Sequence, residues 1–147
     1  KNKIKKEEDF PSPSFHLFLY IELECAVLGT DNPFASEVGE ILSCNDFYDY
    51  DAKYILGTSG LNIPANIPKE ASLEIRETAV KAFKALGCFG LSRVDFFLAD
   101  NGKVYLNELN TMPGFTSISM YPKLMENLGI PYGELLDRLI KLAYERN

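Results

Sequence analysis

A hairpin signal in the second half of the chain constrains the fold more than any other feature. Asn101-Gly102 lies between two runs of alternating apolar and polar residues, 93–100 and 103–110. Both residues tolerate the positive φ of a two-residue type I′ turn, and such a pair is the strongest short hairpin cue. The spacing therefore predicts two antiparallel strands, in which Asp95 faces Glu108 and Arg93 faces Asn110.

This register divides the hairpin into two faces, because side chains alternate along a strand. The polar face carries Arg93, Asp95, Glu108 and Asn110. The opposite face is apolar, and we expect it to be buried through Val94, Phe96, Leu98, Tyr105 and Leu109. Nearer the turn, the same register pairs Phe97 with Leu106.

The polar face predicts a divalent-metal site. Two carboxylates directly opposite each other destabilise a sheet unless a cation lies between them. Asp95, Glu108 and the Asn110 amide offer the hard oxygen ligands that Mg²⁺ and Mn²⁺ prefer. Arg93 beside them can neutralise phosphate charge. A metal–nucleotide site is therefore the leading hypothesis, and a surface hairpin with scattered charges is the alternative.

The segment that follows, NTMPGFTSISMYP (110–122), is a candidate anion site. Pro113-Gly114 is a turn pair, and a glycine lets backbone N–H groups approach an anion. Such groups can stabilise an oxyanion or hold a carboxylate. Thr116, Ser117 and Ser119 offer hydroxyls nearby. Taken alone, a loop of this composition is most often only a loop.

Composition excludes several classes of function. The net charge of −6 argues against a nucleic-acid partner. No apolar run approaches the ~20 residues that span a membrane. Three cysteines and one histidine form neither a CxxC pair nor a zinc pattern, so the cysteines are interpreted as reduced thiols of a cytoplasmic protein.

The remaining patterns predict an α+β domain at 21–147, after a charged and divergent segment at 1–20. Strands are expected within 15–28 and 38–44, loops at 30–39 and 57–69, and helices at 72–86, 122–128 and 133–144. Ser72 is the expected N-cap of the first helix. The apolar stripe of the last helix predicts that Leu136 and Ile140 are buried. We expect an antiparallel sheet with its helices packed on one face.

Three runs of sequence resemble D-alanine–D-alanine ligases of the ATP-grasp superfamily. RVDFF (93–97) with VYLNELNTMPGFTSISMYPKL (104–124) is similar to their C-terminal part. DFYDYDAKY (46–54) is similar to their mobile loop, and ELECAVLG (22–29) to the segment after their adenine hinge. The resemblance spans roughly 21–146 and implies the C-terminal subdomain of the ATP-grasp fold. It departs from the family at FHLFLYI (15–21), where acidic residues and a glycine are usual.

The resemblance implies roles at the metal and the phosphates. Asp95, Glu108 and Asn110 match the metal ligands. Arg93 matches the arginine that contacts the transferring phosphoryl group and the tetrahedral intermediate. The implied cofactors are ATP and Mg²⁺ or Mn²⁺, with two ions in the intact enzyme.

Other matching residues imply substrate and nucleotide contacts. Gly114 matches the glycine whose backbone N–H serves the oxyanion hole, and Ser119 matches the serine that binds the carboxylate of the second D-alanine. Lys53 and Tyr54 match the lysine and tyrosine of the closing loop. The implied nucleotide contacts are Glu22, at the ribose hydroxyls, together with Phe47, Lys53, Phe97 and Glu108.

In this family, ATP phosphorylates the carboxylate of one D-alanine, and the amine of a second attacks the acyl phosphate. The product is D-alanyl-D-alanine for peptidoglycan precursors, and a homodimer of the intact enzyme is compatible with the resemblance. Relatives also have an N-terminal substrate domain and a central lobe, which nothing in this chain matches. We therefore expect a fragment that is inactive alone. Two alternatives stay open: another ATP-grasp carboxylate–amine ligase, and a non-catalytic metal- or nucleotide-binding remnant.

Overall fold

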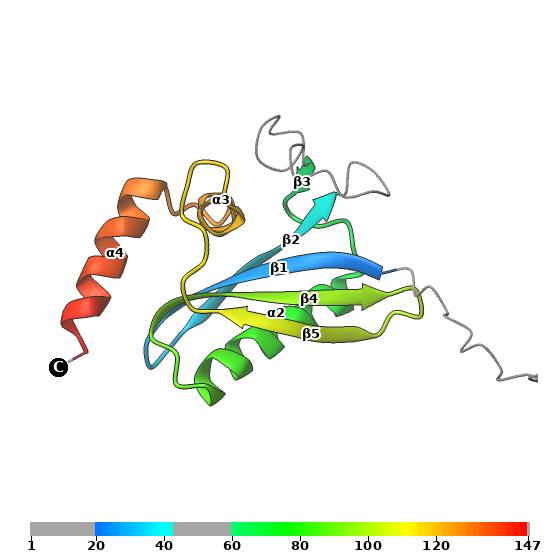
Figure 1. Cartoon of the computed structure of the whole chain (residues 1–147), viewed down its shortest axis with the longest axis horizontal. Coiled ribbons are helices and arrows are strands. Elements are labelled where there is room, and N and C mark those ends of the chain that lie inside the picture. Colours follow the sequence, from blue (N-terminus) through cyan, green and yellow to red (C-terminus); the bar gives the residue numbers. More distant parts are fainter. Residues whose placement is uncertain (1–19, 43–59, 147) are drawn as a thin grey trace, which may run out of the picture.

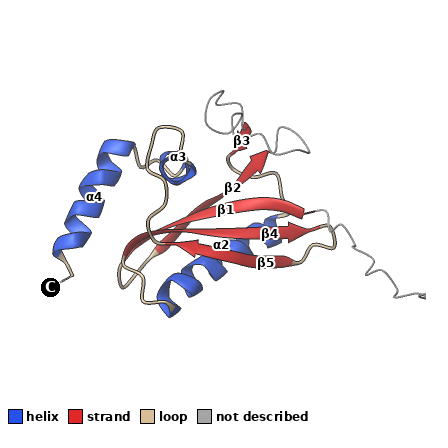
Figure 2. Cartoon of the chain, in the orientation of Figure 1, coloured by secondary structure: helices blue, strands red, loops and turns tan. Residues whose placement is uncertain are grey.

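Five strands that are spread along the sequence form one antiparallel sheet, in the order β3-β2-β1-β4-β5 (Figure 1). The computed structural model of the chain describes residues 20–42 and 60–146. Within them the strands are β1 (Tyr20–Gly29), β2 (Phe34–Leu42), β3 (Gly60–Asn62), β4 (Gly90–Ala99) and β5 (Val104–Asn110). The helices are α2 (Lys69–Ala85), α3 (Met120–Asn127) and α4 (Tyr132–Tyr144) (Figure 2). The predicted α+β class and antiparallel sheet are confirmed.

The central strand β1 explains why helices lie on both faces of the sheet. Leu23, Cys25 and Val27 point into the core that contains α2. The alternate residues Ala26 and Leu28 point into the core that contains α3 and α4. Because both faces of β1 are apolar here, each needs its own cover. The expectation that the helices share one face does not hold: the sheet separates α2 from α3 (Figure 1).

Helix α2 covers one face through a stripe of residues spaced four apart: Ala71, Ile75, Ala79 and Phe83. It begins after Pro68, and the N–H of Ser72 already donates to the Pro68 carbonyl at 3.0 Å. Ser72 is therefore inside the helix, and its prediction as N-cap is wrong. The ion pair between Arg76 Nη1 and Glu37 Oε1, at 2.7 Å, joins α2 to β2.

Helix α3 lies close against the other face. A Cβ at Gly39 of β2 would lie 2.8 Å from Met120 Sδ, so the Met120 side chain packs directly against this glycine. The fully buried Tyr121 donates its hydroxyl to the Val27 carbonyl of β1 at 3.0 Å. Burial raises the pKa of Tyr121, so the phenol remains a neutral donor. These contacts fix the start of α3, where Ser119 precedes the first turn.

Two predictions outside the core were wrong. Strand β2 begins at Phe34 and β3 lies at Gly60–Asn62, both within predicted loops, because pairing of β2 with β1 and of β3 with β2 extends these segments. Leu136 and Ile140 are exposed on α4, which packs through Leu135, while Leu139 and Leu142 are only partly buried. No helix in the described ranges is long and apolar enough to cross a membrane.

Candidate functional site

The hairpin places the predicted polar residues opposite one another. Arg93 pairs with Asn110, and Asp95 pairs with Glu108, as predicted. The turn itself differs from the prediction. The Ala99 N–H donates to the Lys103 carbonyl at 3.0 Å, so three residues rather than two connect the strands. Gly102 takes the positive φ, +80°, that this loop requires.

A β-bulge restores the predicted register at the site. Asn107 is an extra residue on β5, because Asp95 pairs with Glu108 while Phe96 pairs with Leu106. Between the bulge and the turn, every pairing is therefore shifted by one residue. Phe97 lies opposite Tyr105 rather than Leu106, and Tyr105 is exposed instead of buried.

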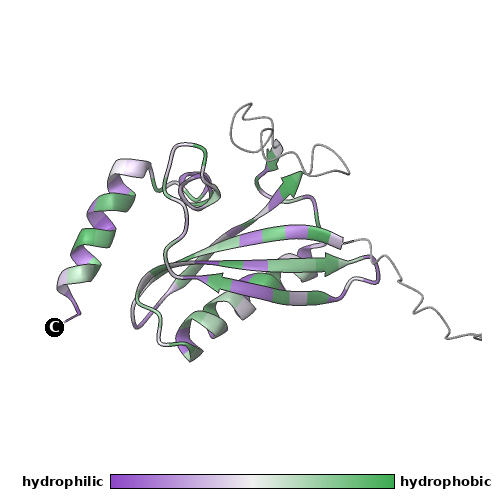
Figure 3. Ribbon diagram, in the orientation of Figure 1, coloured by the Kyte–Doolittle hydropathy of each residue, from purple (hydrophilic) through white to green (hydrophobic). Residues whose placement is uncertain are grey.

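Three carboxylates lie in register across the sheet. Glu24 of β1 pairs with Asp95 of β4, which pairs with Glu108 of β5. Hydrophilic segments lie side by side on these strands (Figure 3). Glu24 was not among the residues predicted for the site. The register between β1 and β4, some 70 residues apart in the chain, was not readable from the pattern.

Arg93 links two of these carboxylates. Its Nε donates to Asp95 Oδ1 at 2.8 Å, and its Nη2 donates to Asp95 Oδ2 at 2.7 Å. The same Nε lies 3.2 Å from Glu24 Oε2. The side chains of Glu24 and Asp95 are only 7% and 8% exposed, and that of Arg93 is 19% exposed. The hydrogen bond with Asp95, supported by the charges of Glu24, Asp95 and Glu108, raises the pKa of Arg93 against the effect of burial.

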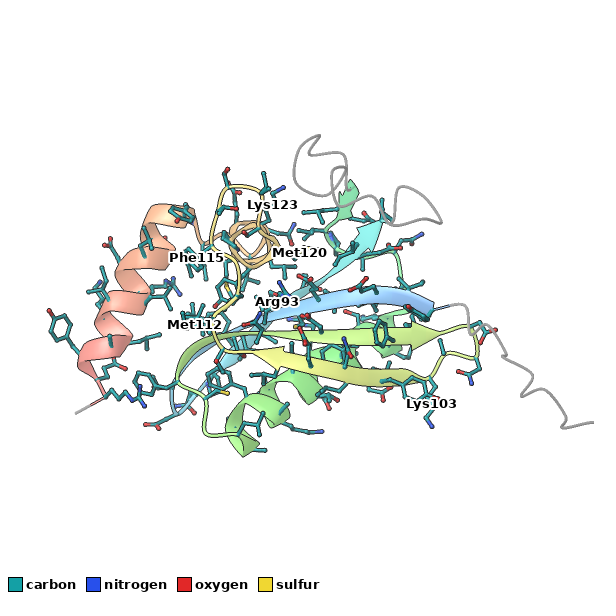
Figure 4. All side chains as sticks on the ribbon, in the orientation of Figure 1. Arg93, Lys103, Met112, Phe115, Met120 and Lys123 are labelled. Carbon is teal, nitrogen blue, oxygen red and sulfur yellow. The ribbon has the colours of Figure 1, made fainter. Side chains whose placement is uncertain are left out.

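A cleft of about 640 Å³ opens over this cluster. The predicted site residues that line it are Glu22, Arg93, Asp95, Glu108, Gly114 and Ser119. Glu24, Met120 and Lys123 line it too, and sequence analysis did not assign them to a site. In Figure 4, Arg93 lies on the sheet below the start of α3, where Met120 is labelled. The sheet thus supplies the charged floor of the cleft, and the loop after β5 with α3 supplies one wall.

The loop after β5 is shaped by hydrogen bonds of its own side chains. Asn110 Oδ1 accepts the Met112 N–H at 3.0 Å, which turns the chain out of the sheet. Ser119 Oγ accepts the Thr116 N–H at 2.9 Å and lies 2.9 Å from Thr116 Oγ1. A Cβ at Gly114 would lie 3.0 Å from Ser119 Oγ. Glycine at this position therefore leaves room for the serine hydroxyl.

The donor set fits Mg²⁺ only if other ligands complete the shell. Among the described residues, no group of three or more His, Cys, Asp or Glu side chains is arranged to hold a metal ion. Asp95 and Glu108 offer two carboxylates, and Mg²⁺ typically takes one or two from protein beside water and phosphate oxygens. Both Asp95 oxygens accept from Arg93, yet each retains a second lone pair.

Of the remaining predicted residues, Asn110 ends β5 and is not among those that line the cleft, Phe97 lies at one end of the sheet, and the others lie outside the described residues. Phe97 lies opposite Glu22 and meets the Tyr20 ring edge-on, with ring centroids 4.5 Å apart. This aromatic edge adjoins Glu22, which lines the cleft. Phe47, Lys53 and Tyr54 lie outside the described residues.

Comparison with known proteins gives a consistent set of matches. Residues 18–141 match the family described as "D-ala D-ala ligase C-terminus". The chain is 64% identical over 126 residues to a D-alanine–D-alanine ligase of Acetivibrio thermocellus, covering 85% of this chain and 34% of that protein. It is 51% identical to one of Caldicellulosiruptor bescii, covering 99% of this chain and 44% of that protein. The chain thus spans about a third to less than half of these relatives.

Solved structures show the same likeness. The D-alanine–D-alanine ligase of Coxiella burnetii superposes with a TM-score of 0.74 at 41% identity, covering 88% of this chain and 33% of that one. The VanG D-Ala:D-Ser ligase of Enterococcus faecalis superposes with a TM-score of 0.70 at 47% identity, covering 83% and 36%.

Proposed function

Because this chain belongs to the D-alanine–D-alanine ligase C-terminal family, we propose that it forms the metal- and phosphate-binding part of an ATP-dependent ligase that joins two D-alanines. Family membership rests on the match over 18–141 and on relatives of 51–64% identity, which confirm the resemblance seen in the sequence. The activity of a whole ligase is a proposal, because the chain spans only part of those relatives.

One observation supports the proposal most directly. A single cleft gathers Arg93, Asp95 and Glu108 from the hairpin with Gly114 and Ser119 from the loop that follows. Phosphoryl transfer depends mainly on positioning and on neutralising charge, which suits the first set. Gly114 and Ser119 in the loop suit the binding of an oxyanion and of a carboxylate.

We assign each residue one task in this chemistry. Asp95 and Glu108, with the Asn110 amide, would hold Mg²⁺ or Mn²⁺, which when bound neutralises the phosphate oxygens of ATP. Arg93 orients the transferring phosphoryl group. The Gly114 N–H stabilises the oxyanion formed when the amine attacks the acyl phosphate.

The second substrate is held at the other side of the cleft. The Ser119 hydroxyl binds the carboxylate of the second D-alanine, and Thr116 fixes its position. Tyr54, which matches the tyrosine of the family's closing loop, would help select an amine over a hydroxyl, so Tyr54→Phe should shift the product toward an ester with D-lactate. Glu22 and Phe97 serve the nucleotide, together with Phe47 and Lys53. Since ATP is the phosphoryl donor, we place the reaction in the cytoplasm.

The test is a chimera in which this chain replaces the matching third of the Acetivibrio thermocellus ligase. ADP release is measured with and without D-alanine, and the product is identified by mass spectrometry. We expect D-alanine-dependent ADP release and D-alanyl-D-alanine. Arg93→Ala should abolish both in a chimera that still folds. A folded chimera that releases no ADP with D-alanine, while the parent ligase does, refutes the proposal.

Two further measurements address the second substrate and the activity of the chain by itself. Because VanG is named a D-Ala:D-Ser ligase, the chimera is also assayed with D-serine as the second substrate. Faster turnover with D-serine than with D-alanine would show that D-serine is the preferred second substrate. The 147-residue chain alone should show at most weak Mg²⁺–nucleotide binding and no D-alanine-dependent ADP release, because positioning requires both substrates to be bound.

A further inference from the structure

Asp95 carries two tasks in the proposed site that compete for the same atoms. Both of its carboxylate oxygens accept hydrogen bonds from Arg93, at 2.8 and 2.7 Å. The proposed function also makes Asp95 a metal ligand. A carboxylate that binds a cation is a weaker acceptor, so its hold on Arg93 decreases when the metal is present. Something else must then keep the guanidinium in place.

Glu24 is placed to do this. Its Oε2 lies 3.2 Å from the same Arg93 Nε that donates to Asp95 Oδ1. Glu24 pairs with Asp95 across β1 and β4, so the two carboxylates flank one guanidinium in a fixed register. The Glu24 side chain is 7% exposed, which keeps water from screening its charge. Asp95 uses the Nε and Nη2 edge of the guanidinium, which leaves the Nη1 edge directed elsewhere.

We propose that Glu24 is a positioning residue that holds Arg93 in place when Asp95 binds the metal. This inference rests on the proposed function. Glu24 acts through Arg93 and does not touch the reacting atoms. With Glu24 present, Arg93 keeps its Nη1 edge aimed at the phosphoryl group whether or not Asp95 is metal-bound. Without Glu24, Arg93 loses one of the two carboxylates that contact it among the described residues, and the other is the one whose hold the metal weakens.

The main test is a double-mutant cycle on kcat in the chimera described above, with Glu24→Gln, Arg93→Lys and the pair. Glu24→Gln should lower kcat about tenfold, the effect of losing one charge-assisted contact, and change the KM for ATP less than twofold. In the Arg93→Lys background, which lacks the planar guanidinium group, Glu24→Gln should change kcat less than twofold. A tenfold loss in both backgrounds overturns the proposal, as does an unchanged kcat for Glu24→Gln.

Two further variants separate position from charge and from folding. Glu24→Asp keeps the charge but is shorter, so it should also lower kcat several-fold; full activity there overturns the proposal. Glu40→Gln removes one charge from β2, where Glu40 pairs with Leu23, and should leave kcat unchanged. If Glu24→Gln fails to fold, Glu24→Asp carries the test, with thermal unfolding as the check on its structure.

A second measurement does not depend on turnover. The Nε–H resonance of Arg93 is followed by ¹⁵N NMR in the 147-residue chain while Mg²⁺ is added. Its hydrogen exchange with water should stay slow in the original chain and accelerate at least tenfold in Glu24→Gln. Equal exchange in both proteins overturns the inference. If the unsubstituted chimera shows no D-alanine-dependent ADP release, but the Arg93 Nε–H exchanges faster in Glu24→Gln than in the original chain, only the proposed function is refuted.

Discussion

Replacing Tyr121 with phenylalanine should loosen the attachment of α3 to the sheet. Tyr121 is fully buried, and its hydroxyl donates to the Val27 carbonyl of β1 at 3.0 Å. The substitution removes that hydrogen bond and leaves the ring in place. Because α3 begins directly after Ser119, the same bond supports one wall of the cleft.

The magnitude follows from burial. A hydrogen bond contributes about 0.5–1.5 kcal/mol net, and leaving a buried partner unsatisfied costs about 1–3 kcal/mol. We therefore expect the free energy of unfolding to fall by about 1–2 kcal/mol, which lowers Tm by roughly 2–8 °C in a chain of this size. Since burial raises the pKa of Tyr121 above its unfolded value of about 10, this contribution is fully present below that pH and is lost as pH rises further.

Tyr132→Phe is the matched control. Its hydroxyl also donates to a backbone carbonyl, that of Phe115 at 3.2 Å, but Tyr132 is 45% exposed. Water can replace the lost bond there, so the effect should stay within about 0.5 kcal/mol. Urea unfolding of the 147-residue chain, followed by circular dichroism, measures both. If Tyr121→Phe and Tyr132→Phe destabilise the fold equally, the argument from burial is refuted.

Three other predictions concern the site and the core. Mg²⁺ should raise the Tm of the chain by mass action, and Glu108→Gln should weaken that dependence; a Tm equally insensitive to Mg²⁺ in both would contradict the ligand assignment. Gly114→Ala should raise the KM of the chimera for the second D-alanine several-fold with little change in Tm, because its Cβ would lie 3.0 Å from Ser119 Oγ. Burial raises the pKa of the Cys25 thiol to about 12, so iodoacetamide at pH 8 should modify the partly exposed Cys88 before Cys25, as peptide mass spectrometry can show.

Local patterns were enough to find the hairpin and its charged face. Alternation predicted which side of β4 is apolar, and Val94, Phe96 and Leu98 are indeed buried. The pairing of Asp95 with Glu108 was right although the turn was not, because the three-residue loop shifts the register by one and the bulge at Asn107 shifts it back. A bulge has no sequence signature strong enough to be read from one chain. The prediction that Tyr105 is buried was wrong because the bulge shifts the register between Asn107 and the turn.

The sequence by itself therefore determined the α+β class, the polar face of the hairpin and the resemblance to a ligase family, because these depend on alternation, turn residues and contiguous motifs. Tertiary structure alone decided which distant segments meet. It aligned Glu24 with Asp95 across the sheet, set α3 on the opposite face from α2, and brought Ser119 to the same cleft as the carboxylates. These outcomes depend on strand order and on covering both faces of β1, and such long-range choices are made by burial of the whole core rather than by any local pattern.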